Sequence, residues 1–131
     1  MNKLLISVPI ELRWRDLDAL NHVNNASFLT FFEESRLRWF ATLAGPWSTA
    51  QLMPVLVAVH INYRRQLSWP QQVIAQLHCE RIGTTSLTIA HRLVAADDHA
   101  ALYADGNSVL VWVDPSGKPV ALPDAVRAAC A

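Results

Sequence analysis

Residues 13–43 decide how this chain folds, and they read RWRDLDALNHVNNASFLTFFEESRLRWFATL. In the second half of this stretch, phenylalanine, leucine and tryptophan recur at helical spacing until Gly45-Pro46. Asn24, Asn25 and Ser27 stand before that run, and side chains of these types cap helix N-termini. The spacing therefore predicts a helix of about five turns. Because apolar residues occupy most of its circumference, we expect other elements to wrap around it.

The residues around this helix alternate between apolar and polar, which is the pattern of half-buried β-strands. The first alternating segment runs from Ile6 to Trp14, and Pro9 inside it favours an edge strand because proline donates no backbone hydrogen bond. Four further strands are predicted after the helix, at about residues 55–64, 72–79, 87–93 and 101–113. Turn residues predict hairpins at Gly83-Thr84 and Asp97-Asp98, a bulge or bend at Gly106, and a short terminal helix after Pro123-Asp124.

One long helix and about five antiparallel strands predict an α+β fold in which a single sheet curls around a single helix. A length of 131 residues suits one compact domain, so we assign residues 1–131 to a single domain. A sheet that is too short to close has two edges, and an exposed edge favours pairing with a second copy. We therefore expect a homodimer and leave open whether dimers pair further into a homotetramer.

Charge and composition limit the possible partners. Lysine and arginine together number 11, as do aspartate and glutamate, so the formal net charge is zero. Such a chain has no overall field to attract nucleic acid or an acidic membrane, and it must hold any anionic ligand with local groups. No stretch approaches the roughly 20 apolar residues that span a bilayer, and residues 1–6 are too short for a secretory signal. The sequence predicts a cytoplasmic protein in which Cys79 and Cys130 stay reduced.

The polar segment before the helix carries a specific motif. Residues 16–25, DLDALNHVNN, are followed by Phe28-Leu29 and by residues 32–36, FEESR. This arrangement resembles the D-x-D-x-x-G-H-V-N-N...Y-L...F-E-x-x-R signature of the hot-dog-fold acyl-CoA thioesterases of the 4-hydroxybenzoyl-CoA thioesterase type, with Asn21 where the family usually has glycine. The likeness continues at residues 61–64, 83–86 and 113–114. It implies a hot-dog fold, a dimer whose sheets join side by side, active sites at the subunit interface, and hydrolysis of an acyl-CoA to a carboxylic acid and free CoA.

The resemblance assigns the catalytic carboxylate to Asp18, which would act on the thioester carbonyl as a nucleophile or as the general base for a water molecule. The residues leave this choice open. Backbone N–H groups of the first helical turn, near Asn25, would bind the oxyanion, because the helix dipole favours negative charge there. Neither a metal ion nor a cofactor is required, since CoA is part of the substrate, and the histidines lack a metal-ligand spacing.

Three more polar residues of this region have two interpretations each. Asp16 is expected to shape the turn by pairing with a neighbouring arginine, although it is also the nearest rival of Asp18. His22 would orient Asp18 or contact the substrate, or would be a structural hydrogen-bonding residue. Glu33 matches the family's glutamate and would reach the site across a dimer, or would be a solvated charge on the helix.

Arg64 and Arg65 are the candidates for binding the phosphates of CoA. A neutral protein needs local guanidinium or ammonium groups to hold a pyrophosphate and a ribose phosphate. Each arginine alone would equally well be a solvated charge on a strand. Arg81 and Arg92 are further candidates of the same kind.

Two other functions stay open at this point. An enoyl-thioester hydratase or dehydratase would need a histidine paired with a carboxylate, and His22 is the only histidine in the right segment. A non-catalytic acyl-binding hot-dog module would keep an apolar groove and lose the chemistry. Residue spacing does not decide the acyl group, its length, or whether CoA or an acyl-carrier protein carries it.

Overall fold

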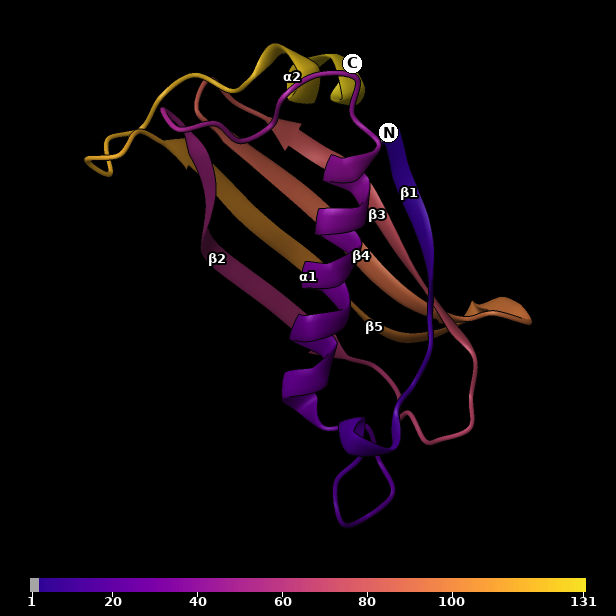
Figure 1. Ribbon diagram of the computed structural model, residues 1–131. Helices are drawn as coiled ribbons and strands as arrows, with labels where there is room; N and C mark the ends of the chain where they lie inside the picture. Colours follow the sequence, from indigo (N-terminus) through magenta and orange to yellow (C-terminus); the bar gives the residue numbers. More distant parts are fainter. Residues whose placement is uncertain (1–2) are drawn as a thin grey trace.

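A computed structural model describes residues 3–131 as one antiparallel sheet with a long helix lying across it (Figure 1). The elements in chain order are β1 (Lys3–Ile10), the 3-10 turn η1 (Trp14–Asp16), α1 (Asn25–Ala41), β2 (Met53–Tyr63), β3 (Val73–Ile82), β4 (Ser86–Ala95), β5 (Asp98–Val113) and α2 (Asp124–Cys130). The sheet has five strands in the order β1-β3-β4-β5-β2, and all neighbours are antiparallel. The predicted α+β hot-dog architecture is therefore confirmed.

Helix α1 begins where the sequence predicts, because Asn24 caps it. The Asn24 Oδ1 accepts a hydrogen bond from the Ala26 N–H at 2.9 Å. The buried residues of the helix are Phe28, Phe31, Phe32, Ser35, Arg36, Trp39 and Phe40. On the other side of the helix, Leu29 and Leu37 are 42% and 52% exposed. The chain by itself therefore wraps one side of α1 and leaves apolar surface on the other.

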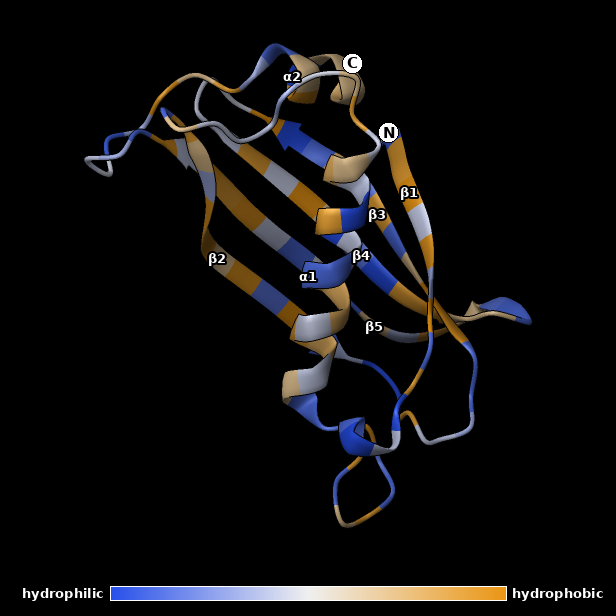
Figure 2. Cartoon of the chain, viewed as in Figure 1, coloured by the Kyte–Doolittle hydropathy of each residue, from blue (hydrophilic) through white to orange (hydrophobic). Residues whose placement is uncertain are grey.

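The core lies between α1 and the sheet. Side chains along the strands alternate between hydrophobic and hydrophilic, as the bands of colour on the sheet show (Figure 2). The fully buried strand residues, each 0% exposed, include Ala75, Leu77, Leu87, Ile89, Leu93, Ala104 and Trp112. Burying one leucine-sized side chain contributes about 1.5–3 kcal/mol. This layer gives a firm base on which the loops at the start of α1 are held.

The first predicted strand is wrong at its C-terminal end. Strand β1 stops at Ile10, and Trp14, expected on the buried side of the strand, instead begins η1 and is 73% exposed. The cause is local, because the Asp16 Oδ2 accepts the Arg13 backbone N–H at 2.9 Å and the Asp16 N–H donates to the Arg13 carbonyl at 2.9 Å. These two hydrogen bonds close a turn that overrides the alternating pattern.

The structure has no bulge at Gly106, where the sequence predicted a bulge or a bend. Gly106 pairs with Ile61 on one side and His91 on the other, and neither register shifts there. A methyl group at this position would lie 1.8 Å from the His60 carbonyl oxygen. Glycine is needed because β2 and β5 approach each other so closely here. The predicted hairpins between β3 and β4 and between β4 and β5 are confirmed, as is the terminal helix.

Strand β2 forms one edge of the sheet and carries exposed apolar side chains. It pairs with β5 on one side only. The exposed apolar residues of β2 are Met53, Val55, Leu56, Val57 and Val59, which are between 39% and 57% exposed. This edge therefore combines unpaired backbone groups with apolar surface.

The C-terminal helix α2 brings the two cysteines into one neighbourhood. Burial, together with the Cys79 thiol beside it, raises the pKa of Cys130 to about 12. Both cysteines are free thiols, in agreement with the sequence. Within residues 3–131, no helix is long and apolar enough to cross a membrane.

Candidate active site

The polar segment between β1 and α1 folds around the buried carboxylate of Asp16. Asp16 is only 2% exposed, and its carboxylate accepts hydrogen bonds from the Arg13 guanidinium at 3.0 and 3.4 Å. The Asp16 carbonyl accepts the Asn24 N–H at 2.8 Å, which ties the turn to the start of α1. The geometry confirms that Asp16 shapes the turn in partnership with an arginine.

Asp18 lies in a tight turn that holds its carboxylate in place. Its Oδ1 accepts the Leu20 N–H at 2.8 Å and the His22 N–H at 3.2 Å. These hydrogen bonds, that from Leu20 first, lower the pKa of Asp18 below its ordinary value, so the group is ionised at neutral pH. The Asp18 Oδ2 has no hydrogen-bond partner in residues 3–131, so this oxygen is available for chemistry.

Asn21 supplies the backbone geometry of this turn. Its φ is +58°, and it is the one non-glycine residue with positive φ in the described chain. Its N–H donates to the Asp18 carbonyl at 3.2 Å. Asparagine tolerates the left-handed conformation better than most residues, so it can stand where the resembled motif has glycine.

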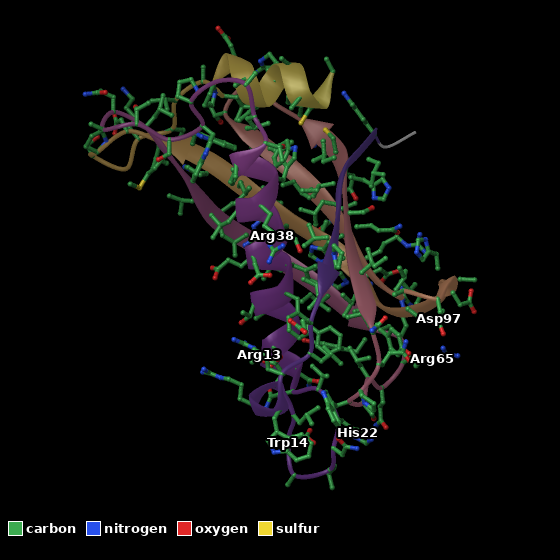
Figure 3. All side chains as sticks on the ribbon, turned by 45° about the vertical axis from the view of Figure 1, so that its right-hand side comes forward. Arg13, Trp14, His22, Arg38, Arg65 and Asp97 are labelled. Carbon is green, nitrogen blue, oxygen red and sulfur yellow. The ribbon has the colours of Figure 1, made fainter. Side chains whose placement is uncertain are left out.

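Asp18 borders a hollow of about 460 Å³. The lining residues are Asp18, Leu20, His22, Val23, Asn25, Phe28, Tyr63, Arg64, Arg65, Gln66 and Leu67. They come from the Asp18 turn, the start of α1 and the segment that leaves β2. The Val23 N–H donates to the Leu67 carbonyl at 2.6 Å and fastens the last of these segments to the first. Figure 3 shows Trp14, His22 and Arg65 toward this end of the molecule.

The first turn of α1 offers a backbone donor in the same hollow. In the described part of the chain, the Asn25 N–H has no acceptor, whereas Asn24 caps the next N–H. The Tyr63 hydroxyl donates to the Asn25 carbonyl at 3.1 Å, and its ring packs edge-on against Phe28 at 5.2 Å between centroids. A carboxylate can attack a carbonyl carbon, and a backbone N–H at the start of a helix can stabilise the oxyanion that results.

His22 lines the hollow and supports Asp18 through its backbone. Its N–H donates to the Asp18 carboxylate, and its carbonyl accepts the Asp18 N–H at 2.8 Å. The imidazole makes no hydrogen bond to any residue that the structure describes.

Glu33 lies away from the hollow. It is exposed on α1, about two turns beyond Asn25, and it is not among the residues that line the hollow. The single chain does not bring Glu33 and Asp18 together. A role for Glu33 therefore depends on a second subunit.

The two candidate phosphate ligands line the hollow but differ in their partners. The Arg64 Nε donates to the Asp105 Oδ1 at 3.1 Å, and Asn62 donates to the same oxygen at 3.1 Å. Burial alone would raise the pKa of Asp105, but these hydrogen bonds lower it below its ordinary value. Arg65 forms no ion pair within residues 3–131, and its guanidinium lies 5.8 Å from the Tyr103 ring centroid. Arg65 is therefore the stronger of the two candidates.

The sequence did not predict that Tyr63 lines the hollow. Tyr63 ends β2, and its hydroxyl reaches the start of α1 from 38 residues away in sequence. Its place in the block of residues 61–64, next to the two arginines, was the available signal. The apolar lining by Phe28 and Leu67 was likewise not predicted.

A second polar cluster lies buried between α1 and the sheet, outside the hollow. The Arg36 Nη1 donates to the Ser108 Oγ at 3.3 Å, and the His91 Nε2 lies 3.2 Å from the His60 carbonyl oxygen. The Phe32 ring stacks on the His91 ring at 3.9 Å between centroids. Burial lowers the pKa of His91 to about 4, so its imidazole is neutral at pH 7. Within residues 3–131, no group of three or more His, Cys, Asp or Glu side chains is placed to hold a metal ion.

A larger groove of about 700 Å³ runs between β1, the start of β3 and α1. Its two arginines are already paired, Arg13 with Asp16 at 3.0 Å and Arg38 with Glu34 at 3.4 Å. The smaller hollow combines a carboxylate oxygen and an unpaired helix-start N–H. Because of these two groups, the hollow beside Asp18 is the better candidate for the active site.

Comparisons with known proteins identify the family of the chain. The model of the thioesterase-like superfamily matches residues 12–130. A solved structure of a candidate acyl-CoA thioesterase from Xanthomonas campestris is 43% identical, covers 89% of this chain and 98% of its own, and superimposes with a TM-score of 0.81. A thioesterase from Thermus thermophilus, solved with coenzyme A and Zn, is 31% identical, with coverage of 97% and 98% and a TM-score of 0.81.

A curated relative extends the comparison to a named activity. The long-chain acyl-CoA thioesterase FadM of Escherichia coli is 27% identical over 125 residues, which are 93% of this chain and 94% of FadM. The region that the superfamily model matches, residues 12–130, includes both the Asp18 turn and α1. The chain belongs to the thioesterase-like superfamily.

Proposed function

We propose that this chain hydrolyses acyl-CoA thioesters to a carboxylic acid and CoA, with Asp18 as the catalytic carboxylate. The observation that carries the proposal is that Asp18 and Asn25 line the same hollow, while the Asp18 Oδ2 and the Asn25 N–H have no hydrogen-bond partner within residues 3–131. Superfamily membership supports the reaction class. The coenzyme A in the Thermus relative and the activity named for FadM support the substrate class.

The carboxylate of Asp18 has an oxygen that would serve as the nucleophile, because both backbone hydrogen bonds are accepted by Oδ1. The lowered pKa of Asp18 keeps the carboxylate in the ionised form that attack on a carbonyl carbon requires. Its Oδ2 would form a bond to the acyl carbon while the C–S bond breaks and CoA leaves as a thiolate. Water would then hydrolyse the mixed anhydride to the carboxylic acid and restore Asp18. The Asn25 N–H would stabilise the oxyanion in both steps, a donor whose loss typically costs about 3 kcal/mol.

Rapid quenching during the first turnover tests the nucleophilic role. Mass spectrometry of the peptide containing Asp18 should detect an acyl adduct while the first equivalent of thiol is released. A full burst of thiol without an adduct on Asp18 would favour the general-base mechanism.

A homodimer formed through β2 would complete the assembly. The free edge of β2 offers backbone donors and acceptors to a second strand, and its exposed valines and leucine would be covered by the pairing. Glu33 would then approach a site from the other subunit. Sedimentation at micromolar concentration should give twice the mass of 14.6 kDa, and a monomer would refute the dimer. Tetramer formation and a cytoplasmic location stay predictions from sequence.

Arg65 would hold a phosphate of CoA, with Arg64 in a lesser role because Asp105 already neutralises it. Replacing Arg65 by glutamine should raise KM for acyl-CoA more than the matched change at Arg64. A larger effect at Arg64 would reverse this order.

A panel of acyl-CoA substrates of graded length, including aromatic ones, tests the proposed function. Release of free thiol is the expected result for at least one of them. Thermal stabilisation by these compounds without turnover would indicate an acyl-binding module instead. Addition of water to an enoyl-CoA without thiol release would indicate a hydratase.

A further inference from the structure

We propose that Trp14 and Trp69 form the platform on which the adenine ring of CoA stacks while an acyl-CoA occupies the Asp18 hollow. This inference rests on the proposed thioesterase function, and it names the part of the substrate that is held outside the reacting centre. Trp14 is 73% exposed and Trp69 is 45% exposed. Because the two indoles contact each other, they form one exposed apolar patch, and such a patch is a candidate binding surface.

The geometry of the pair leaves room for a stacked ring. The two indole centroids are 5.5 Å apart and the ring planes meet at 88°. In this edge-to-face arrangement one ring covers at most one face of the other, so the contact within the pair leaves at least one face of each indole uncovered. A free indole face binds the π-face of a purine.

The remaining tryptophans are not available for this role. Trp39 and Trp112 are 2% and 0% exposed, and Trp47 stacks on the Phe40 ring at 4.5 Å between centroids. Among all five tryptophans of the chain, Trp14 and Trp69 therefore stand apart.

Both indoles continue the segments that line the hollow. Trp14 stands four residues before Asp18, which limits the separation of their Cα atoms to about 14 Å. Trp69 follows Leu67, which lines the hollow and accepts the Val23 N–H. Figure 3 shows both Trp14 and His22, a residue that lines the hollow, at the lower end of the molecule. A flexible pantetheine arm joins the thioester of CoA to its nucleotide, so an acyl-CoA with its thioester at Asp18 would extend its nucleotide end out of the hollow, and the proposal places that end on the two indoles.

The charges around the platform suit a phosphorylated nucleotide. Arg15, next to Trp14, is exposed and forms no ion pair with any described residue. Arg65, four residues before Trp69, is likewise without an ion pair in residues 3–131. Arg13 is already committed to Asp16. The two segments that carry the indoles thus also carry two guanidinium groups that form no ion pair within residues 3–131, on a chain with no net charge.

The same pair could also act only as a clamp between its two segments, and the experiment separates these roles. Thiol release is measured on an acyl-CoA and on the N-acetylcysteamine thioester of the same acid, which lacks the nucleotide. Replacing Trp14 or Trp69 by alanine should raise KM for acyl-CoA about tenfold and change kcat/KM for the truncated thioester by less than about twofold. Phenylalanine at either position should restore most of the affinity for acyl-CoA, and Trp47→Phe serves as the control.

Binding of adenosine 3′,5′-bisphosphate provides a second readout that needs no turnover. This nucleotide should quench the tryptophan fluorescence of the wild type and of Trp47→Phe, and the quenching should be lost in Trp14→Ala and Trp69→Ala. Equal losses on both thioesters in the alanine variants, or unchanged nucleotide binding, would overturn the platform. A wild type that binds the nucleotide yet hydrolyses neither thioester would overturn the proposed function and leave the platform standing.

Discussion

Acid should destabilise this protein through His91, because the fold buries this imidazole in its neutral form. His91 is 1% exposed, and burial lowers its pKa to about 4 from an ordinary value of 6.5. The guanidinium of Arg36 also opposes a second positive charge, whereas the His60 carbonyl and Asp105 partly compensate. As the pH falls below about 6.5, the unfolded chain therefore takes up the proton before the folded one does.

The sign and size of the effect follow from these two pKa values. The free energy of unfolding is insensitive to His91 above about pH 7 and falls between pH 6.5 and 4. At pH 4 the loss from this one residue is about 3 kcal/mol, a large part of the stability of a domain of this size. Carboxylates with lowered pKa, such as Asp18 and Asp105, add losses in the same direction at lower pH.

Urea unfolding of the wild type and of His91→Gln at pH 7.5, 6, 5 and 4 isolates this contribution. The variant should be less stable at pH 7.5, since it loses the stack on Phe32. Between pH 7.5 and 4, however, the wild type should lose about 3 kcal/mol more than the variant. Parallel stability curves for the two proteins across this range would refute the reasoning.

Three further predictions concern the backbone conformation at Gly106, Gly117 and Asn21 and the hydrogen bond of Tyr63. Gly106→Ala should lower the free energy of unfolding by about 3 kcal/mol, because its methyl would lie 1.8 Å from a backbone oxygen. Gly117→Ala should lower it by only about 1–2 kcal/mol, because φ is +85° there but no other atom lies within 4 Å of the methyl. Equal urea midpoints for the two variants would contradict this. Asn21→Gly should keep thiol release while Asn21→Val loses stability by about 1–2 kcal/mol, and a tolerant valine would show that the positive φ is unimportant. Tyr63→Phe should cost about 1 kcal/mol in urea unfolding and lower thiol release less than tenfold, because it removes only the hydrogen bond to the first turn of α1; no change in either would contradict that role.

Local sequence patterns predicted most of the fold. The helical spacing after Asn24 located α1, and alternation located the strands that pack beneath it. The alternating pattern did not predict the position of Trp14, because the Asp16 carboxylate accepts the Arg13 backbone N–H and forms a turn there in place of a strand. The strand order was not predictable from such patterns, since it depends on pairing between residues far apart in sequence.

The candidate site was predicted to a different degree at each residue. The role of Asp16 in shaping the turn is confirmed, since its carboxylate is buried against Arg13, whereas the catalytic role of Asp18 stays a prediction. The difference between Arg64 and Arg65 was not predictable, because the partner of Arg64 lies 41 residues away. Long-range contacts of this kind leave no local signal in the sequence.

The rate of thiol release by Asp18→Asn tests the central claim most directly. Asparagine keeps the size of the side chain and an oxygen for the turn, but it removes the charge and the nucleophilic oxygen. The variant should lose at least about 100-fold in kcat/KM for an acyl-CoA that the wild type hydrolyses, while Asp97→Asn, an exposed change in the β4–β5 hairpin, keeps the wild-type rate. A folded Asp18→Asn variant with near-normal turnover would contradict the assignment of Asp18 as the catalytic carboxylate.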